Sequence, residues 1–317
     1  MRVLFWGTPE FATAPLRALI GEGFEVVAVV TQPDKPVGRS HSTLHQSPVK
    51  QVAIAEGIPV LQPEKPRGDA FLAELAAFEP DISIVVAYGH ILPKSVIDLP
   101  RLGTLNIHAS LLPLLRGAAP IQTAIREGHA DTGVSIMQMV PALDAGPVIH
   151  TASIPILPDE TALELSLRLS ELGASTLIEA LALVGLGVAE PKAQDDSLAT
   201  YAHKLTRESG RVDWNGSAHD VGRHIRAYDP KPGAWSRVNG VDVKFFGVRI
   251  APRGTAHSAG DVIAIDDAGM LVACGGGAVR VTNVQPAGKK RQTAAEWARG
   301  RGVRVGDKFD TEPVELP

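Results

Sequence analysis

The sequence predicts an α/β fold, with a mostly parallel sheet in its first half and a small β domain in its last third. Near-continuous apolar strands alternate with helical patterns before about residue 160, which is typical of a parallel sheet covered on both faces. Short β patterns separated by Gly and Pro dominate after Val212. Because 317 residues suit two domains, we predict domains at 1–188 and 209–317, joined by a polar linker at 189–208.

Local patterns justify each element of the first domain. Thr8-Pro9-Glu10 has the residues of an N-cap, a first-turn proline and a first-turn acid, so we expect a helix over 9–21. The stretch at 132–140 and that at 148–156 alternate apolar and polar residues, as antiparallel edge strands do. Further buried strands are expected at 2–7, 25–31, 59–61, 81–87 and 104–108, with helices at 48–56, 69–78 and 160–183.

The last third differs from the rest in pattern and in charge. Five β patterns, at 233–238, 241–248, 262–265, 271–273 and 279–284, predict a small barrel or sandwich. Residues 209–317 hold 16 Lys and Arg against 12 Asp and Glu, whereas the whole chain has a formal net charge of -4. A basic domain on an acidic body indicates a polyanionic partner for that domain.

Composition excludes several classes of protein. A hydrophobic share of 44% and a charged share of 21% are typical of globular proteins. No apolar run reaches the length of a membrane span, and no cleavage site follows the first strand, so we expect a cytoplasmic protein without a membrane partner. The single cysteine, Cys274, excludes an internal disulfide and a Cys-rich metal site.

Polar groups lie at or just beyond the ends of three predicted parallel strands. They are Gly7-Thr8-Pro9, Tyr88-Gly89-His90, and the pair Asn106 and His108. In an open α/β sheet, ligands bind beyond the carboxyl ends of the strands, so these groups should converge on one crevice. Gly7-Thr8-Pro9 lacks the repeated glycines of a dinucleotide fingerprint, which counts against a nicotinamide cofactor.

Asn106, His108 and Asp144 have the side chains that an acyl transfer needs. The Asn106 amide can donate to a developing oxyanion, and His108 can move a proton near neutral pH. Asp144, in a Gly-Pro turn, can orient the imidazole. No Ser or Cys nucleophile adjoins them, so we expect direct attack by the acceptor. Each residue also has a plainer explanation: a core histidine for His108, and turn formers for Asn106 and Asp144.

The segment NIHASLLPLLRGAAPI, at 106–121, resembles the signature of folate-dependent formyltransferases. Five further segments match the branch that acts on methionyl-tRNA, along nearly the whole chain: GTPEFA, TQPDKPVGR, AYGHILP, LDAGP and IRAYDPKPGAW, with PAGKK near the end. The resemblance implies a Rossmann-like domain followed by an OB-like barrel. It also implies transfer of a formyl group from 10-formyltetrahydrofolate to the amino group of methionine on initiator tRNA, with no metal and no nicotinamide.

The resemblance also assigns residues. Asn106, His108 and Asp144 become the catalytic trio, and Ser110, Leu111, Leu112 and Pro113 the folate-binding segment. Arg39, in a long loop at 33–48 that we expect to lack regular structure, matches a residue that contacts tRNA. The family often has basic residues just beyond it, but this chain has Ser and His there. Lys289 and Lys290, in the basic domain, are the further expected tRNA contacts.

Several questions stay open at this level. A related enzyme that formylates a nucleotide sugar or glycinamide ribonucleotide would share the Asn-His-Asp trio, although the 33–48 loop and the basic domain favour tRNA. A binding protein on a degenerate scaffold is a third alternative, against which the intact trio argues. Arg116 is either a substrate anchor or part of a structural ion pair. Nothing in the sequence demands a partner subunit, so we expect a monomer.

Overall fold

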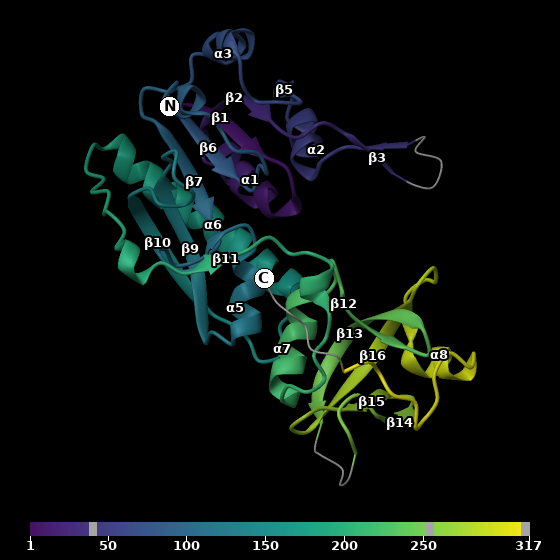
Figure 1. Cartoon of the computed structure of the whole chain (residues 1–317). Coiled ribbons are helices and arrows are strands. Elements are labelled where there is room, and N and C mark those ends of the chain that lie inside the picture. The colour runs from purple at the N-terminus through teal and green to yellow at the C-terminus, as the bar shows by residue number, and fades with distance from the viewer. Residues whose placement is uncertain (38–42, 252–256, 312–317) are drawn as a thin grey trace. The chain divides into compact units, whose positions relative to one another are not determined.

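The computed structural model describes residues 1–37, 43–251 and 257–311, which form two compact units (Figure 1). The C-terminal unit includes two short stretches that lie inside the predicted first domain, 1–188. The predicted domain boundaries stay a prediction. The N-terminal unit contains Met1–Pro120, Asp131–Ile154 and Ser166–Ala202, and the C-terminal unit contains Ile121–Ala130, Pro155–Leu165 and His203–Pro317.

A seven-stranded sheet forms the centre of the N-terminal unit (Figure 1). Its strands are β1 (Arg2–Gly7), β2 (Glu25–Val30), β5 (Val60–Leu61), β6 (Ile82–Val86), β7 (Thr104–His108), β9 (Asp131–Gln138) and β10 (Val148–Pro155). In space the order is β10-β9-β7-β6-β1-β2-β5. The strands from β7 to β5 are parallel, and β9 runs antiparallel to β7. The order reverses between β1 and β6, where an open α/β sheet forms its ligand crevice.

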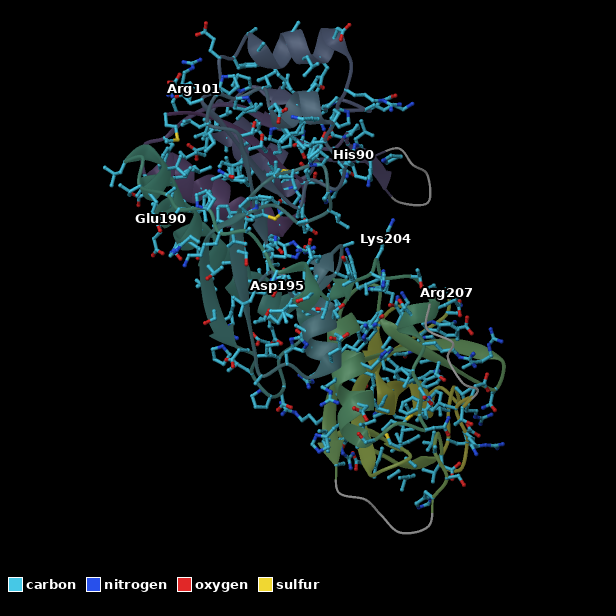
Figure 2. The ribbon with its side chains drawn as sticks, turned by 60° about the vertical axis from the view of Figure 1, so that its left-hand side comes forward. His90, Arg101, Glu190, Asp195, Lys204 and Arg207 are labelled. Carbon is cyan, nitrogen blue, oxygen red and sulfur yellow. The ribbon has the colours of Figure 1, made fainter. Side chains whose placement is uncertain are left out.

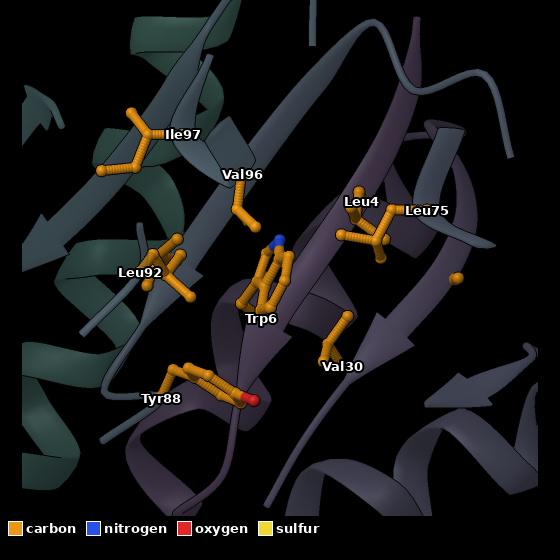
Figure 3. Close-up of a cluster of buried hydrophobic side chains, with 10 residues drawn as sticks. Leu4, Trp6, Val30, Leu75, Tyr88, Leu92, Val96 and Ile97 are labelled. Carbon is orange, nitrogen blue, oxygen red and sulfur yellow. The ribbon is translucent and has the colours of Figure 1, made fainter. Parts of the chain in front are cut away.

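Apolar side chains bury both faces of this sheet. On one face, Trp6 and Val30 pack with Leu75 of α3 (Asp69–Ala76) and Val96 of α4 (Lys94–Ile97), as Figure 3 shows. The indole Nε1 of Trp6 donates to Ser83 Oγ at 3.3 Å, so this buried donor is satisfied. The opposite face is covered by α1 (Thr13–Gly21), α2 (Pro48–Ala55) and α6 (Ala162–Gly185).

The start of the first helix differs from the prediction. A short 3₁₀ helix, η1 (Glu10–Ala12), precedes α1, and Pro9 makes no side-chain capping bond. Thr8 does not act as the N-cap, because its hydroxyl donates to the Tyr88 carbonyl at 3.1 Å, beyond the end of β6. A tertiary hydrogen bond between two strand ends has replaced a local cap. By contrast, α2 begins as its sequence indicates, with Ser47 accepting from the Lys50 backbone N–H at 3.1 Å.

The loop at 33–48 contains regular structure, so the expectation of none is wrong. Strands β3 (Lys35–Val37) and β4 (Thr43–His45) form an antiparallel pair. The base of this pair is fixed by polar contacts: Lys50 Nζ lies 2.6 Å from Asp34 Oδ2, and Gln62 Nε2 donates to Asp34 Oδ1 at 2.8 Å. The Lys50 contact and the Gln62 amide lower the pKa of Asp34.

The first part of the predicted linker is ordered against the N-terminal unit. Here η2 (Asp196–Leu198) precedes β11 (Tyr201–Ala202), which pairs in parallel with β8 (Arg116–Gly117). The residues of the predicted linker up to Ala202 therefore belong to the N-terminal unit. Strand β8 lies shortly after β7, the strand of Asn106 and His108, so the first part of the predicted linker lies near the candidate site.

The C-terminal unit is built on an antiparallel sheet. Its strands are β12 (Ala234–Val238), β13 (Val241–Ala251), β14 (Val262–Asp266), β15 (Gly269–Ala273), β16 (Ala278–Pro286) and β17 (Gln292–Thr293). In the core, the Trp214 ring stacks on Phe309 with centroids 5.4 Å apart and meets Phe245 edge-on at 5.3 Å. The predicted class, a Rossmann-like domain followed by a small β domain, is confirmed.

The sequence patterns missed helices in this unit. They are α5 (Pro120–Glu127), η3 (Glu208–Gly210), α7 (Ala218–Tyr228) and α8 (Ala294–Arg299). Both α7 and α8 pack on the sheet, and α8 begins with a capping box between Thr293 and Glu296. Within the described ranges, each helix is too short or too polar to cross a membrane.

Candidate active site

Strand β7 places Asn106 and His108 on one face of the sheet, because residues two apart in a strand point to the same side. Ile107, between them, faces α6: a Cβ added to Gly173 of that helix would lie 3.1 Å from Ile107 Cγ2. Asn106 and His108 therefore face away from α6. On their side, Val85, the β6 neighbour of Asn106, packs into the Trp6 cluster.

Asn106 is half-buried in the middle of a paired strand. Its backbone lies opposite Val85 of β6 and Met137 of β9, so it does not form a turn. Within residues 1–37, 43–251 and 257–311, its side-chain amide makes no hydrogen bond. The strand thus holds an NH₂ donor in a fixed position, free for a ligand oxygen.

His108 is buried, with 6% of its surface exposed, and both ring nitrogens face oxygen atoms. Nε2 lies 2.9 Å from the Leu115 carbonyl oxygen and, because a carbonyl only accepts, donates to it. Nδ1 lies 3.7 Å from Asp144 Oδ2, which is beyond a hydrogen bond but within range of ionic attraction. In a doubly protonated imidazole, Nε2–H donates to Leu115 and Nδ1–H faces a carboxylate oxygen. No hydroxyl or thiol in the described ranges hydrogen-bonds the ring.

Asp144 lies in a tight turn that holds its carboxylate toward His108. Its φ angle is +48°, a left-handed conformation that Asp adopts more readily than most residues. The backbone N–H of Gly117 donates to Asp144 Oδ2 at 2.8 Å, to the same oxygen that faces His108. Gly146 must be glycine, because a Cβ there would collide with the Gln138 carbonyl. The Leu-Asp-Ala-Gly-Pro turn thus has a geometric reason for its sequence.

Gly117 is a second position where only glycine fits. Its φ is +119°, and an added Cβ would lie 2.6 Å from the Ala202 carbonyl oxygen. Its N–H can therefore reach Asp144 while β8 stays against β11. Leu115, two residues earlier, accepts from His108. The 115–117 segment thus binds both members of the His108–Asp144 pair.

The predicted folate-binding segment forms a fixed turn after β7. Ser110 is buried, and its hydroxyl donates to the Leu114 carbonyl at 2.6 Å. Ser135 Oγ accepts from the Leu112 N–H at 3.0 Å and donates to the Ser110 carbonyl at 2.8 Å. Ser110 is therefore engaged within the turn, whereas Leu111, Leu112 and Pro113 are half-buried. Polar side chains hold the backbone, and apolar ones remain for a ligand.

The ends of β1 and β6, which were predicted to converge, are hydrogen-bonded to each other, and the end of β2 joins them. Thr8 and Gln32 both donate to the Tyr88 carbonyl, at 3.1 and 3.0 Å. The Tyr88 ring packs edge-on against Trp6, and burial raises the pKa of its phenol to about 12. His90, labelled in Figure 2, is exposed, with its ring 5.6 Å from that of Tyr88. The carboxyl ends of β1, β2 and β6 thus form one hydrogen-bonded rim.

The predicted tRNA contacts have different outcomes. Arg39 lies outside the described residues. Lys289 and Lys290 are exposed on the turn after β16, and neither pairs with a carboxylate within the described ranges. Their neighbour Arg291 instead lies over the Phe246 ring at 4.1 Å. Arg226, which lies in the matched IRAYDPKPGAW segment and was not among these expected contacts, donates to the Glu160 carbonyl at 3.0 Å.

A pocket of about 530 Å³ opens in the C-terminal unit beside this turn. It is lined by Trp235, Arg207, Lys244 and Gly288, among others. The Arg207 guanidinium (Figure 2) lies 4.7 Å from the centroid of the Trp235 ring, whose Nε1 donates to the Arg207 carbonyl at 2.7 Å. Asp242, also at this wall, pairs with Arg207. The pocket combines cationic groups with a flat stacked surface.

Two features bear on other chemistries. The described residues contain no cluster of three or more His, Cys, Asp and Glu side chains able to hold a metal ion. Cys274 is buried in the C-terminal unit, and burial raises the pKa of its thiol to about 12, so the thiolate needed for nucleophilic attack is scarce near neutral pH.

Sequence patterns missed three residues that build this site. They are Ser135, which fixes the turn after β7; Gly117, which binds Asp144; and Gln194, whose amide donates to the Asp144 carbonyl at 2.8 Å. Gln194 lies in the predicted linker, where no periodicity marks it. Arg116, whose role was open, donates to this glutamine and to Asp196, and is not exposed to a substrate.

Comparison with known proteins decides the family. A model described as formyl transferase matches residues 1–181, and one described as formyl transferase, C-terminal domain, matches residues 204–302. The chain belongs to the formyl transferase family. The resemblance found in the sequence is thus confirmed over most of the chain.

Named relatives are similar along nearly the whole length. The methionyl-tRNA formyltransferase of Thiobacillus denitrificans is 47% identical over 313 residues, which cover 98% of this chain and 99% of that protein. The methionyl-tRNA formyltransferase of Stutzerimonas stutzeri is 48% identical over 291 residues, 91% of each chain. Among solved structures, HypX from Aquifex aeolicus in complex with tetrahydrofolic acid has a TM-score of 0.69 at 22% identity, over 97% of this chain and 50% of that one, which indicates a shared fold.

Proposed function

We propose that this protein is a methionyl-tRNA formyltransferase, which transfers the formyl group of 10-formyltetrahydrofolate to the amino group of methionyl initiator tRNA for translation initiation. The observation that carries the proposal is identity of 46–48% to curated enzymes of that name, over both domains. The His108–Asp144 pair and the free Asn106 amide supply suitable chemistry.

The reaction is direct attack on an acyl carbon. The unprotonated methionyl nitrogen bonds to the formyl carbon, and the carbonyl oxygen becomes an oxyanion in a tetrahedral intermediate. The carbon–N10 bond of the folate then breaks, and a proton passes from the attacking nitrogen to the leaving nitrogen. The products are formylmethionyl-tRNA and tetrahydrofolate. The carbon keeps its oxidation level, so the balanced step needs no nicotinamide.

The three side chains divide this work. Asn106 donates to the oxyanion from a fixed strand. His108 moves the proton, and we assign the transfer to Nδ1, since its 3.7 Å contact with Asp144 is looser than the Nε2 bond to Leu115. Asp144 stabilises the imidazolium that forms while the proton is held. Aligning the two bound substrates supplies much of the remaining acceleration.

The substrates bind to surfaces on the two units. The half-buried Leu111, Leu112 and Pro113 pack against the flat folate ring, with Ser110 holding their turn. Arg39, Lys289 and Lys290 contact tRNA phosphates, and the pocket beside Trp235 adjoins the two lysines. The proposal places the enzyme in the cytoplasm, where initiator tRNA is used, as a monomer without a membrane partner.

A substrate panel tests this function. The purified protein is given 10-formyltetrahydrofolate with methionyl initiator tRNA, the same tRNA uncharged, free methionine, or an amino-sugar nucleotide, and formylated amine is measured by mass spectrometry. We expect rapid formylation of the charged tRNA alone. Faster formylation of the amino-sugar nucleotide would overturn the proposal in favour of a small-molecule enzyme.

Loss of the two exposed lysines should weaken tRNA binding through electrostatics. We expect Lys289→Ala with Lys290→Ala to flatten the slope of log affinity against log salt concentration by roughly one per lysine, because each phosphate contact releases bound counterions. The measurement is a tRNA titration at several salt concentrations, with folate binding followed in parallel. Lys308→Ala, an exposed lysine of the same unit away from this turn in sequence, is the matched control. An unchanged slope in the double variant would remove these lysines from the interface.

A further inference from the structure

Arg116 is a buried cation whose main partner is neutral. Only 3% of its surface is exposed. Its Nε and Nη2 donate to Gln194 Oε1 at 3.0 and 2.8 Å, and Nη2 also contacts Asp196 Oδ1 at 2.7 Å. The Asp196 side chain is 81% exposed, so solvent screens that ion pair. The guanidinium therefore acts chiefly as a clamp on one amide oxygen.

This clamp fixes which way the Gln194 amide points. Arginine only donates hydrogen bonds, so the Gln194 atom facing Arg116 must be the oxygen. The NH₂ group then faces two carbonyls, and it donates to Asp144 O at 2.8 Å and Gly146 O at 2.7 Å. Every donor of the amide is used, and all partners lie in the N-terminal unit.

These bonds hold the turn that aims the Asp144 carboxylate at His108. Asp144 has a left-handed φ of +48°, which costs free energy relative to extended or helical backbone. Gln194 binds the backbone on both sides of Ala145, while the Gly117 N–H binds the carboxylate. The residue before Gly117 is Arg116 itself. Strand β8 thus holds the Asp144 turn in two ways. Gly117 binds the carboxylate directly, and Arg116 binds Gln194, which in turn binds the backbone of the turn.

We propose that Gln194 is a positioning residue for Asp144 and that Arg116 orients Gln194 for this task. The inference rests on the proposed role of the His108–Asp144 pair in the reaction. It assigns a function to the start of the 189–202 segment, marked by Glu190 and Asp195 in Figure 2. The segment that leads toward the C-terminal domain thereby sets the geometry of the catalytic carboxylate.

The decisive variant is Gln194→Glu, which keeps the shape and the acceptor for Arg116 but replaces the NH₂ group with an oxygen. That oxygen faces the carbonyls of Asp144 and Gly146, so the turn loses both bonds and meets repulsion. We expect kcat at saturating substrates to fall about tenfold to hundredfold, the scale of a displaced catalytic group. The KM values for folate and tRNA should stay within about twofold. Gln194→Met is the second variant. Asp195→Asn is the matched control, because within the described ranges the Asp195 side chain hydrogen-bonds only Ser197, and asparagine keeps an acceptor oxygen for it.

A double-mutant cycle separates positioning from general stability. If Gln194 acts through Asp144, Gln194→Glu should lower kcat less than about threefold in an Asp144→Asn background. Three outcomes would overturn the inference. The reductions in kcat from the Gln194 and Asp144 changes could multiply in the double variant, or kcat of Gln194→Glu could be unchanged. Thermal denaturation could also show that both Gln194 variants are unfolded. Normal turnover by Asp144→Asn alone would instead remove Asp144 from the proposed mechanism, and the inference with it. If Asp144→Asn has a lowered kcat while Gln194→Glu has a normal one, the role proposed for Gln194 is wrong but the role of Asp144 in the mechanism stands.

Discussion

Replacing His108 with alanine is expected to lower kcat by about 10²- to 10⁴-fold, because the variant loses the group that we propose moves the proton between two nitrogens. The proposed binding surfaces, the 111–113 turn and the C-terminal unit, are unchanged in this variant, so the KM values for both substrates should change little. The loss should be largest where the leaving nitrogen most needs protonation, that is, toward high pH. Single-turnover formylation of methionyl-tRNA, measured across pH, checks this.

Stability must be separated from chemistry in that experiment. His108 is buried and hydrogen-bonded to Leu115, so its removal costs roughly 1–3 kcal/mol by leaving that carbonyl unpaired. Thermal denaturation should therefore show a lowered but cooperative transition. His150→Ala is the matched control, since His150 pairs with Glu179 at 2.7 Å on a partly exposed surface of the same unit. If His108→Ala turns over within fivefold of wild type, His108 has no catalytic role.

The sequence predicted the helices and strands whose bounds are set by neighbouring residues in the chain. Strand β7 spans 104–108 as predicted, because an apolar run ending in polar residues marks a buried strand that stops at a sheet rim. The same applies to α2, where Ser47 and Pro48 are the N-cap and the first residue. Two helices were missed although signals existed: Ser217 with Asp220 begins α7, and Thr293 with Glu296 begins α8.

Other features depend on tertiary contacts that no local pattern contains. Thr8 has the sequence of an N-cap but binds Tyr88, a residue eighty positions away. Gln194 lies in a polar, aperiodic stretch, and its order comes from Arg116, which is 78 positions away. Glutamine at such a position looks like a solvated surface residue. The residue types suggested that Asp144 can orient His108, but only the family resemblance favoured this over a simple turn residue, since spacing in the chain does not bring a strand end and a turn together.

Asn106 offers the sharper test of the proposed chemistry, because one variant keeps its shape. We expect Asn106→Ala to lower kcat by about 10²- to 10³-fold, the usual effect of removing one oxyanion donor. Asn106→Asp should be at least as slow. The carboxylate fills the same volume, but it cannot donate when ionised and it repels the negative charge that develops on the formyl oxygen.

The pair of variants distinguishes a donor from a spacer. Asn106 makes no side-chain hydrogen bond within the described ranges, so neither change breaks one, and the free energy of unfolding should stay within about 1 kcal/mol of wild type. If Asn106 only filled space, the aspartate variant would be active and the alanine variant slow. That order would contradict oxyanion stabilisation by the amide. If Asn106→Asp lowers kcat as much as Asn106→Ala or more, the shape of the side chain is not sufficient for catalysis. Asparagine and aspartate differ only in donor capacity and charge, so this result would support a role for the NH₂ donor.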